Sequence, residues 1–441
     1  MGKLAAFFMS GVLCVLFFAG CSKDNGNNPQ PLTYGVISGR IIDPLISSLQ
    51  NAGIASANVI VYNASTNAPV TRTLSDNQGY YRIEVAAGTY YLNVAAQGFK
   101  PFPDANAAPL PFNAAINDTV IKDVNLTEDP AAASTGSISG TVVLGTSGVV
   151  NVLIVATRST DSLALSTVSG PAGFFAIYNI PAGTYALRCY AAGYGQVSDT
   201  LITVSANTAL TGINLHVVAV TNVRLTGKIT FLASPNSQVD ITLVNPLTRE
   251  AIPGLDTIND ANLNYSLSGI PPGTYIAWAS YRNDGYVMDP DWIRKFGLPV
   301  VTFSATDTLK TLNFSVTGAI TIISPTNPAD SVYPVTVSTT TPTFSWMKYP
   351  AAHEYIIEVF NSSGDRIWGG YDTNGTVLLN TQITQQDTSV VFNFDGSALD
   401  SLHNGESYRW KIYADNSATP GVQGLISASE DLRGLFKVVL P

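Results

Sequence analysis

The sequence predicts an all-β protein built from tandem antiparallel β-sandwich modules. Short runs rich in Val, Ile, Thr and Tyr alternate with Gly, Pro and Asn, which is the pattern of strands joined by turns. Beyond residue 20, no stretch has the sustained apolar spacing of an amphipathic helix. The 441 residues exceed the ~250–300 that one hydrophobic core usually supports, so we expect several domains.

Composition and charge narrow the class of protein. Charged residues make up 12% of the chain and hydrophobic residues 46%, which is the reverse of a disordered sequence. With 22 basic and 31 acidic residues, the formal net charge of −9 argues against nucleic acid as a partner and against attraction to an anionic membrane surface. Three cysteines and three histidines leave little material for metal sites, so we expect no metal and no cofactor.

The first segment of the chain is a targeting signal. Lys3 precedes an apolar run that ends at Phe18, and this run is shorter than the ~20 residues that span a bilayer. The sequence Phe18-Ala19-Gly20-Cys21 resembles the lipobox of bacterial lipoproteins. The resemblance implies that residues 1–20 are a signal peptide and that Cys21 is lipidated. The alternative is an ordinary signal peptide followed by a chance cysteine.

The residues that follow indicate where the protein is anchored. Ser22-Lys23-Asp24 resembles the signal that places some Gram-negative lipoproteins on the outer face of the outer membrane, which implies a lipid-anchored protein facing the cell exterior. Residues 21–33, rich in Gly, Asn and Pro, are predicted to be a flexible tether. Cys14 would leave with the signal peptide, so Cys189 would be the one free thiol of the mature chain.

Three similar units then follow one another. Each contains a Gly-Thr-Tyr step between two strands, and the steps recur at intervals of 95 and 90 residues. Each unit also opens with a short strand around a glycine. The steps are Gly88-Thr89-Tyr90, Gly183-Thr184-Tyr185 and Gly273-Thr274-Tyr275, and the opening glycines are Gly39, Gly140 and Gly227. Units of this length predict antiparallel sandwiches with a hairpin at each step.

The first unit resembles a carboxypeptidase regulatory-like domain, through residues 57–61, 75–81 and its Gly-Thr-Tyr step. The resemblance implies a prealbumin-like β-sandwich, and such modules are mostly non-catalytic and serve varied partners. The second unit keeps Gly173-Phe174-Phe175 but lacks the preceding aspartate, and the third keeps only the Pro-Pro-Gly-Thr-Tyr step and the opening strand. We therefore place three prealbumin-like modules at residues 34–128, 136–218 and 222–317.

The last segment, residues 319–441, follows another pattern. Its stretches 342–346, 355–359 and 402–414 resemble a fibronectin type III-like domain. We expect Trp346 in its core and Tyr408 as a tyrosine corner, with its hydroxyl bonded to upstream backbone. Alternation along the last stretch puts four residues on the inward face: Tyr408, Trp410, Ile412 and Ala414. The four modules together are expected to form a rod.

Candidate catalytic residues are few. The sequence has no Gly-x-Ser-x-Gly, His-Glu-x-x-His or Gly-x-Gly-x-x-Gly motif, and its three histidines fall at a strand end or in predicted turns. Without an activated nucleophile or a paired acid and base, we predict that the protein is not an enzyme. The acidic loop 283–291 does not have the spacing of a calcium loop, and we interpret it as a polar connection.

Aligning the three Gly-Thr-Tyr steps singles out Trp278. Its counterparts are Asn93 and Arg188, on the face that points away from the core. Either the insertion 289–296 covers the indole, or Trp278 belongs to an aromatic platform for a sugar ring, with carboxylates taking the hydroxyls. The candidate ligand-binding residues are Trp278, Tyr281, Tyr286, Trp292, Asp289 and Asp291.

The same alignment predicts the environment of the remaining thiol. Cys189 matches Val94 and Ala279, both on the inward face, so we expect a buried and unreactive thiol. The functional prediction from the whole sequence is a non-catalytic, lipid-anchored surface protein that binds carbohydrate or another surface ligand in a nutrient-capture system. The alternative is a structural or adhesive stalk that binds a protein partner.

Overall fold

The computed structural model describes residues 34–46, 52–65, 68–103, 109–232, 237–280, 285–328, 334–417 and 424–441. The regular secondary structure of these residues is almost entirely β-strand, which confirms the predicted fold class. The predicted signal peptide, Cys21 and the tether fall outside the described residues, as do Tyr281, Asn283 and Asp284. Within the described part of the chain, no helix is long and apolar enough to cross a bilayer.

The first module is a sandwich of two sheets. Its strands are β1 (Gly35–Ile42), β2 (Asn58–Asn63), β3 (Pro69–Leu74), β4 (Tyr80–Val85), β5 (Gly88–Ala95), β6 (Phe112–Ala114), β7 (Thr119–Ile121) and β8 (Val124–Asn125). One sheet has the order β4-β1-β7 with β8 also beside β1, and the other has the order β3-β2-β5-β6. Alternation along β2 and β5 sends Val59, Val61, Leu92 and Val94 into the core between the sheets.

The second module repeats this architecture. It comprises a short 3₁₀ helix (Pro130–Ser134), β9 (Gly136–Leu144), β10 (Ser147–Gly148), β11 (Leu153–Arg158), β12 (Ala164–Val168), a 3₁₀ turn (Pro171–Gly173), β13 (Phe174–Ile180), β14 (Gly183–Tyr190), β15 (Tyr194–Gln196), β16 (Thr200–Val204) and β17 (Ala209–Ala219). One sheet has the order β10-β9-β17-β15, with β13 beside β9, and the other has the order β12-β11-β14-β16.

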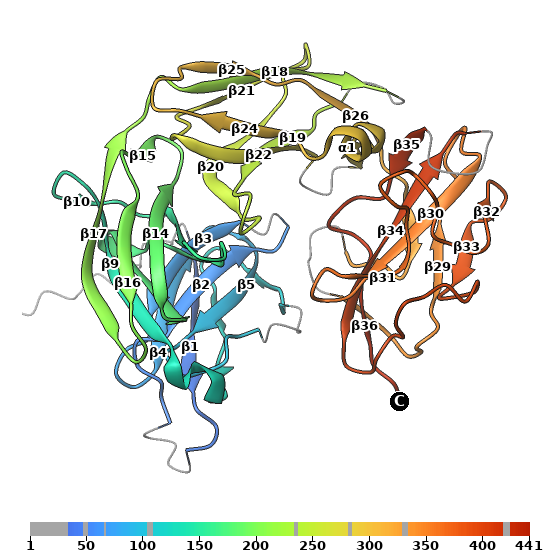
Figure 1. Ribbon diagram of the computed structural model, residues 1–441. Helices are drawn as coiled ribbons and strands as arrows, with labels where there is room; N and C mark the ends of the chain where they lie inside the picture. The colour runs from blue at the N-terminus through green and yellow to red at the C-terminus, as the bar shows by residue number, and fades with distance from the viewer. Residues whose placement is uncertain are drawn as a thin grey trace, which may run out of the picture.

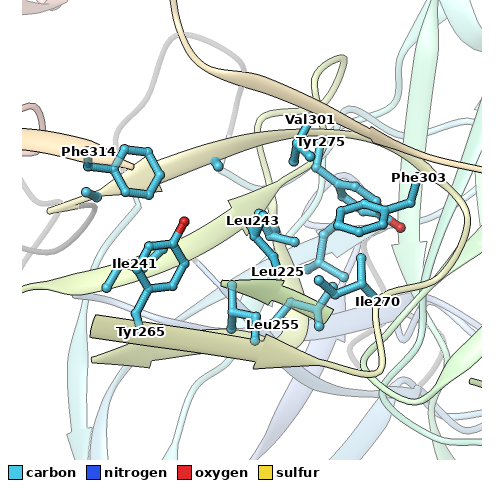
Figure 2. Packing of buried hydrophobic residues seen from close by; sticks show 14 of the residues in the cluster. Leu225, Ile241, Leu243, Leu255, Tyr265, Ile270, Tyr275, Val301, Phe303 and Phe314 are labelled. Carbon is cyan, nitrogen blue, oxygen red and sulfur yellow. The ribbon is translucent and has the colours of Figure 1, made fainter. Parts of the chain in front are cut away.

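The third module adds a helix to the same plan. Its elements are β18 (Arg224–Phe231), β19 (Asp240–Val244), β20 (Ala251–Ile258), β21 (Asn264–Ser268), β22 (Gly273–Ala279), β23 (Tyr286–Met288), α1 (Pro290–Phe296), β24 (Val300–Phe303), β25 (Leu309–Thr311) and β26 (Phe314–Gly318). The sheets are β21-β18-β26-β23, with β25 beside β18, and β20-β19-β22-β24. Figure 2 shows Leu225, Leu243 and Tyr275 packed between them.

The opening glycines have a clear structural reason. In all three modules the last strands run parallel to the opening strand: β7 and β8 beside β1, β17 beside β9, and β25 and β26 beside β18. Partway along each pairing, a carbonyl of the returning chain points at the opening glycine. A Cβ on Gly39, Gly140 or Gly227 would lie 2.0, 1.8 or 1.8 Å from the carbonyl oxygen of Lys122, Ile213 or Leu312, respectively. Only glycine tolerates this approach.

The Gly-Thr-Tyr steps are pinned in the same way in each module. The tyrosine hydroxyl donates a hydrogen bond to the carbonyl four residues earlier, before the turn. The donor–acceptor distances are 3.0 Å from Tyr90 to Ala86, 2.8 Å from Tyr185 to Pro181, and 2.7 Å from Tyr275 to Pro271. Each ring is buried in its core, so one side chain both packs the sandwich and satisfies a turn carbonyl.

The third module keeps more of the repeat than its sequence indicated. In the first module Asp76 closes a turn by accepting hydrogen bonds from the backbone N–H groups of Gln78 and Tyr80, both at 2.9 Å. Asp260 makes the equivalent pair with Asn262 and Asn264, both at 2.8 Å. The prediction that only the opening strand and the Pro-Pro-Gly-Thr-Tyr step persist was therefore too narrow. The signal was hidden because Leu263, at φ 66°, takes the place of Gly79, at φ 84°.

The fourth module is a sandwich of a different topology. Its strands are β27 (Ile322–Ser324), β28 (Val335–Val337), β29 (Thr343–Trp346), β30 (Glu354–Phe360), β31 (Arg366–Gly369), β32 (Ile383–Thr384), β33 (Ser389–Val391), β34 (Ser407–Asp415), β35 (Leu425–Ala428) and β36 (Leu435–Val438). A sheet of order β27-β29-β33 faces one of order β28-β36-β34-β30-β31, in which β32 adds to β30 and β35 adds to β34.

The predicted inward face of β34 is confirmed. Tyr408, Trp410, Ile412 and Ala414 are all buried, and Trp346 is buried with them. The Trp410 indole N–H donates to the Pro325 carbonyl at 2.6 Å, so its one polar atom is satisfied inside the core. The Tyr408 hydroxyl accepts from the backbone N–H of His403 at 2.8 Å, which is the upstream contact expected of a tyrosine corner.

Cys189 also lies where the repeat alignment placed it. The residue is buried in β14, opposite Ile154 of β11, and contributes to the core of the second module. Burial raises the pKa of the Cys189 thiol to about 12, because the thiolate would lose its hydration. The predicted burial is thus confirmed, and the thiol is held in its unreactive protonated form at neutral pH.

The modules do not form the rod that we expected from the sequence. In Figure 1 the first module (blue) lies against both the second (green) and the third (yellow), and the fourth (red) stands to one side of the third. The amide of Asn58 donates to Thr167 of the second module at 3.3 Å, and the Tyr62 hydroxyl donates to Glu250 of the third at 3.0 Å. The chain therefore turns back on itself instead of extending.

The second and third modules share one core. Leu153, Val155 and Val168, which point away from the core of the second module, are fully buried in the hydrophobic cluster of the third. The backbone N–H of Gly193 in the second module donates a hydrogen bond to the Gly269 carbonyl in the third, at 2.7 Å. Because separating these modules would expose that apolar surface, they form a single packed body.

Truncating Trp410 should unfold the fourth module selectively. Trp410→Ala should cost about 3–5 kcal/mol, because it leaves a large cavity among Phe344, Phe436 and their neighbours. Differential scanning calorimetry of the full chain should show one transition moving to markedly lower temperature. Trp292→Ala, which truncates an indole that is 52% exposed, is the control and should leave that transition in place. Equal melting of both variants would contradict the core assignment.

Candidate functional site

A cavity of about 330 Å³ lies between the third and fourth modules. Its lining combines apolar and charged residues. The third module contributes Val244, Arg249, Trp278 and Leu298, and the fourth contributes Arg409, Asp431 and Leu432. The volume of the cavity is near the lower end of the ~300–1,000 Å³ range of ligand pockets. A mostly apolar lining with a few polar groups is also typical of such pockets. One of its lining residues, Trp278, was singled out by the sequence.

Trp278 is held on β22, opposite Thr242 of β19. Its side chain points to the outer face of the sheet and is partly buried. There it packs with a small apolar cluster that includes Val244 and Leu298, so the chain just after helix α1 covers part of the indole. The rest of the indole lines the cavity. The indole is therefore partly covered by this cluster and partly exposed to the cavity.

Arg249 reaches the cavity from the hairpin between β19 and β20. The Asn245 side chain orders this hairpin by accepting hydrogen bonds from the backbone N–H groups of Leu247, at 2.9 Å, and Thr248, at 3.1 Å. Arg249 itself adopts the left-handed conformation, with φ 60°. Glu250, the next residue, bonds instead to Tyr62 of the first module. The hairpin is thus held against the first module through Glu250, while Arg249 lines the cavity.

The wall from the fourth module is built on the outer face of β34. Arg409 and Lys411 alternate there with the inward-facing core residues. Lys411 forms an ion pair with Asp431, so the one acidic group in the cavity lining already has a counter-ion. The charged residues of the lining are thus two arginines and one aspartate whose counter-ion is a lysine.

Polar contacts hold the fourth module against the third. Glu430 accepts a hydrogen bond from the backbone N–H of Gly285 at 2.7 Å, and burial raises the pKa of this carboxyl. The Ser427 hydroxyl donates to the Gly318 carbonyl at 2.6 Å. The hydroxyls of Thr317 and Tyr349 meet at 2.9 Å. These contacts lie on both sides of the short connection between the modules, so they fix the orientation of the cavity walls.

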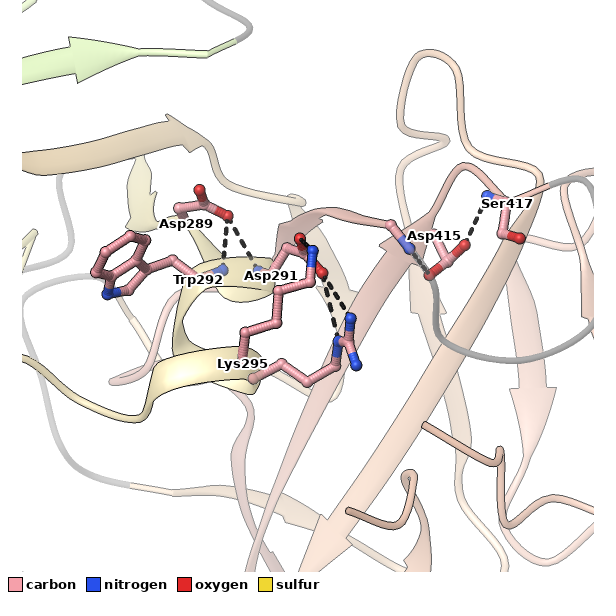
Figure 3. A network of polar contacts seen from close by, with 8 residues as sticks. Asp289, Asp291, Trp292, Lys295, Asp415 and Ser417 are labelled. Atoms are coloured by element: carbon pink, nitrogen blue, oxygen red, sulfur yellow. Dashed lines mark hydrogen bonds and ion pairs between the residues drawn. The ribbon is translucent and has the colours of Figure 1, made fainter. Parts of the chain in front are cut away.

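The insertion of the third module forms helix α1, and its carboxylates stabilise that helix. Asp289 is the N-cap and accepts from the backbone N–H groups of Asp291, at 3.0 Å, and Trp292, at 3.2 Å (Figure 3). Asp291 pairs with Arg294 at 3.0 Å and with Lys295. The helix lies beside β35 of the fourth module. Both carboxylates proposed as hydroxyl partners thus already have intrahelical roles.

The aromatic candidates lie in three different surroundings. Trp278 faces the cavity, whereas the Trp292 ring packs on Phe296, with centroids 4.4 Å apart, on the exposed side of α1. Tyr286 packs edge-on against Phe231 at 5.4 Å, next to the core of the third module. Tyr281 lies outside the described residues.

Sequence reasoning missed the two arginines of the cavity. Arg249 follows a hairpin turn and Arg409 alternates with core residues, and both patterns are ordinary for solvent-exposed arginines. Of the two, only Arg249 could have been noticed in the sequence, because it ends a turn at a position where glycine or asparagine is common. Within the described ranges, no group of three or more His, Cys, Asp or Glu side chains could hold a metal ion.

Comparison with known proteins supports the repeat assignment. The carboxypeptidase regulatory-like domain family matches residues 36–114 and 137–218, which are the first two modules. The chain thus carries two repeats similar to that domain. No curated protein matches the sequence.

Solved structures that match part of the chain include two pilins and one further bacterial protein. The Bacillus anthracis TIE protein is 12% identical, with 65% of this chain and 51% of that chain covered and a TM-score of 0.18. A streptococcal ancillary pilin is 11% identical, with 64% and 98% covered and a TM-score of 0.20. The major pilin subunit BcpA of Bacillus cereus is 10% identical, with 65% and 100% covered and a TM-score of 0.18. The matched part of this chain spans about half the length of the TIE protein.

The junction behind Arg249 should respond to pH through Glu250. Burial raises the pKa of this carboxyl above its usual 4.5, so the folded state binds this proton more tightly than the unfolded state does. Protonated Glu250 therefore contributes its full share to the free energy of unfolding below the pKa that it has in the unfolded state. This contribution is lost as the pH rises through the pKa that Glu250 has in the folded state. Glu250→Gln removes this loss and still accepts from Tyr62. In thermal unfolding the variant should exceed the wild type at pH 7 and match it at pH 4.

Glu84 provides a control of opposite sign. It is exposed, and the hydrogen bond from Arg82 lowers the pKa of its carboxyl. Glu84→Gln should therefore give a small loss or no change of stability at pH 7, since exposed ion pairs contribute little. A Glu250→Gln variant that is less stable than the wild type at pH 7 would show that the junction requires the carboxylate.

Proposed function

We propose that the protein is a non-catalytic, lipid-anchored surface protein that binds carbohydrate in the cavity between its third and fourth modules. The observation that supports this most is the position of Trp278. The third module places an indole where its sister modules carry Asn93 and Arg188, and this indole lines a cavity with charged groups at its rim. An aromatic face beside hydrogen-bonding groups matches the C–H faces and hydroxyls of a sugar ring.

The rigidity of the two walls favours binding. One wall lies on the body formed by the second and third modules, and the other is fixed to it by Glu430 and Ser427. A ligand entering such a cavity would order few additional side chains, which lowers the entropic cost of binding. Together with attachment to the outer membrane through Cys21, this suits a protein that captures polysaccharide at the cell exterior for nutrient uptake.

A second candidate is an adhesive surface protein that binds a protein partner. The observation that favours it is the edge strand β16 of the second module. Leu201 on this strand and Val197 in the turn before it are 69% and 84% exposed. An edge strand with exposed apolar side chains can pair with an extended segment of another chain.

Loss of the Trp278 ring should weaken carbohydrate binding. If an indole–sugar contact contributes about 1–1.5 kcal/mol, then Trp278→Ala in the full chain should lower affinity about tenfold. Isothermal titration against a panel of polysaccharides measures this, with thermal unfolding to confirm that the variant is folded. Trp292→Ala is the matched control. Loss of binding with Trp292→Ala but not with Trp278→Ala would move the site to helix α1.

The anchor can be tested separately. Cys21→Ser should release the protein from the membrane fraction, because the thioether that would carry the lipid cannot form. Fractionation of cells, followed by protease treatment of intact cells, measures attachment and exposure to the exterior. Retention of the Cys21→Ser variant in the outer membrane would place the anchor elsewhere in the chain.

A further inference from the structure

We infer that the ligand of the cavity is an acidic saccharide, bound through a uronate carboxylate by Arg249 and Arg409. This inference rests on the proposed function and adds the chemical class of the sugar. A neutral sugar would need donors and acceptors of both kinds around the indole. The cavity instead offers two guanidinium groups, one from each module, and one carboxylate that is already paired.

Arg249 is placed at a conformational cost. Its backbone lies at φ 60°, a region that L-residues other than Asn and Asp seldom adopt. A glycine or an asparagine would close the same turn without that cost, so the turn alone does not account for an arginine. The residue is exposed, and none of the ion pairs between described residues includes it. Its positive charge at the rim of the cavity is thus available to a ligand.

Arg409 supplies the second guanidinium from the opposite wall. On the same face of β34, the Lys411 ammonium neutralises Asp431, which would otherwise repel an anion. The charged residues that line the cavity are therefore two arginines and one aspartate, and Lys411 neutralises the aspartate. Arginine is suited to this role because its planar fork can donate two parallel hydrogen bonds to one carboxylate.

The size and shape of the cavity fit one sugar unit with its carboxylate. A volume of about 330 Å³ accepts a small ring rather than a long chain. Val244, Leu298 and the indole of Trp278 form one apolar side, against which the C–H face of a pyranose can pack. The carboxylate on C5 of a uronate lies at the edge of that ring, where it can meet the guanidinium groups at the rim.

The test compares each acidic oligosaccharide with its own carboxyl-reduced form. Trimers from polygalacturonate, alginate and glucuronan, each with its reduced neutral counterpart, are titrated calorimetrically into the full chain. We expect at least one acidic trimer to bind about tenfold more tightly than its counterpart, as for one charged hydrogen-bonded contact. Arg249→Met and Arg409→Met should each remove this preference. Arg224→Met, which deletes an exposed charge on β18 of the same module, should retain it.

The outcomes separate the inference from the function on which it rests. Equal binding of acidic and reduced trimers would overturn the acidic-ligand inference and leave carbohydrate binding intact. Retention of the acidic preference in both Arg249→Met and Arg409→Met would also overturn it, because the carboxylate would then be bound elsewhere. Absence of binding by every trimer and every polysaccharide of the panel would overturn both proposals.

Discussion

The fold of the three repeated modules depends on one close contact between a carbonyl oxygen and a glycine. In each module the returning chain runs beside the opening strand and directs one carbonyl oxygen at Gly39, Gly140 or Gly227. In the first and third modules the same carbonyl also accepts the hydroxyl of a core tyrosine, Tyr81 at 2.7 Å or Tyr265 at 2.6 Å. The contact thus joins the two ends of each module, and it lets the last strands lie parallel to the first.

Closing each module in this way leaves its second sheet to make contacts with other modules. The outer face of that sheet carries Asn58 and Tyr62 in the first module, and these bond to the second and third modules. The buried Arg72 adds a hydrogen bond to the Phe174 carbonyl at 3.1 Å, and burial lowers the pKa of its guanidinium to about 10. Short linkers therefore do not lead to a rod here, because the outer sheet faces specify how the modules pack.

The sequence predicted what depends on local alternation and on repetition. The inward positions of Cys189 and Trp410 followed from period-two burial, and the glycines and tyrosines of the modules followed from their recurrence. The arrangement of the modules could not be predicted, since Tyr62 and Glu250 belong to strands far apart in the chain. The cavity was likewise hidden: Trp278 was recognisable by comparison with its sister residues, whereas Arg409 carries no sign of lying opposite it.

The position of the cavity follows from repeated use of the same sheet face. In the second module this face is apolar, with Leu153 and Val155, and it packs into the core of the third module. The equivalent face of the third module is mixed, because β19 presents Thr242 and Val244 and β22 presents Trp278. When the fourth module packs against it, a large indole and charged side chains cannot close into a continuous core. The cavity thus lies at a joint where the repeated face is no longer continuously apolar.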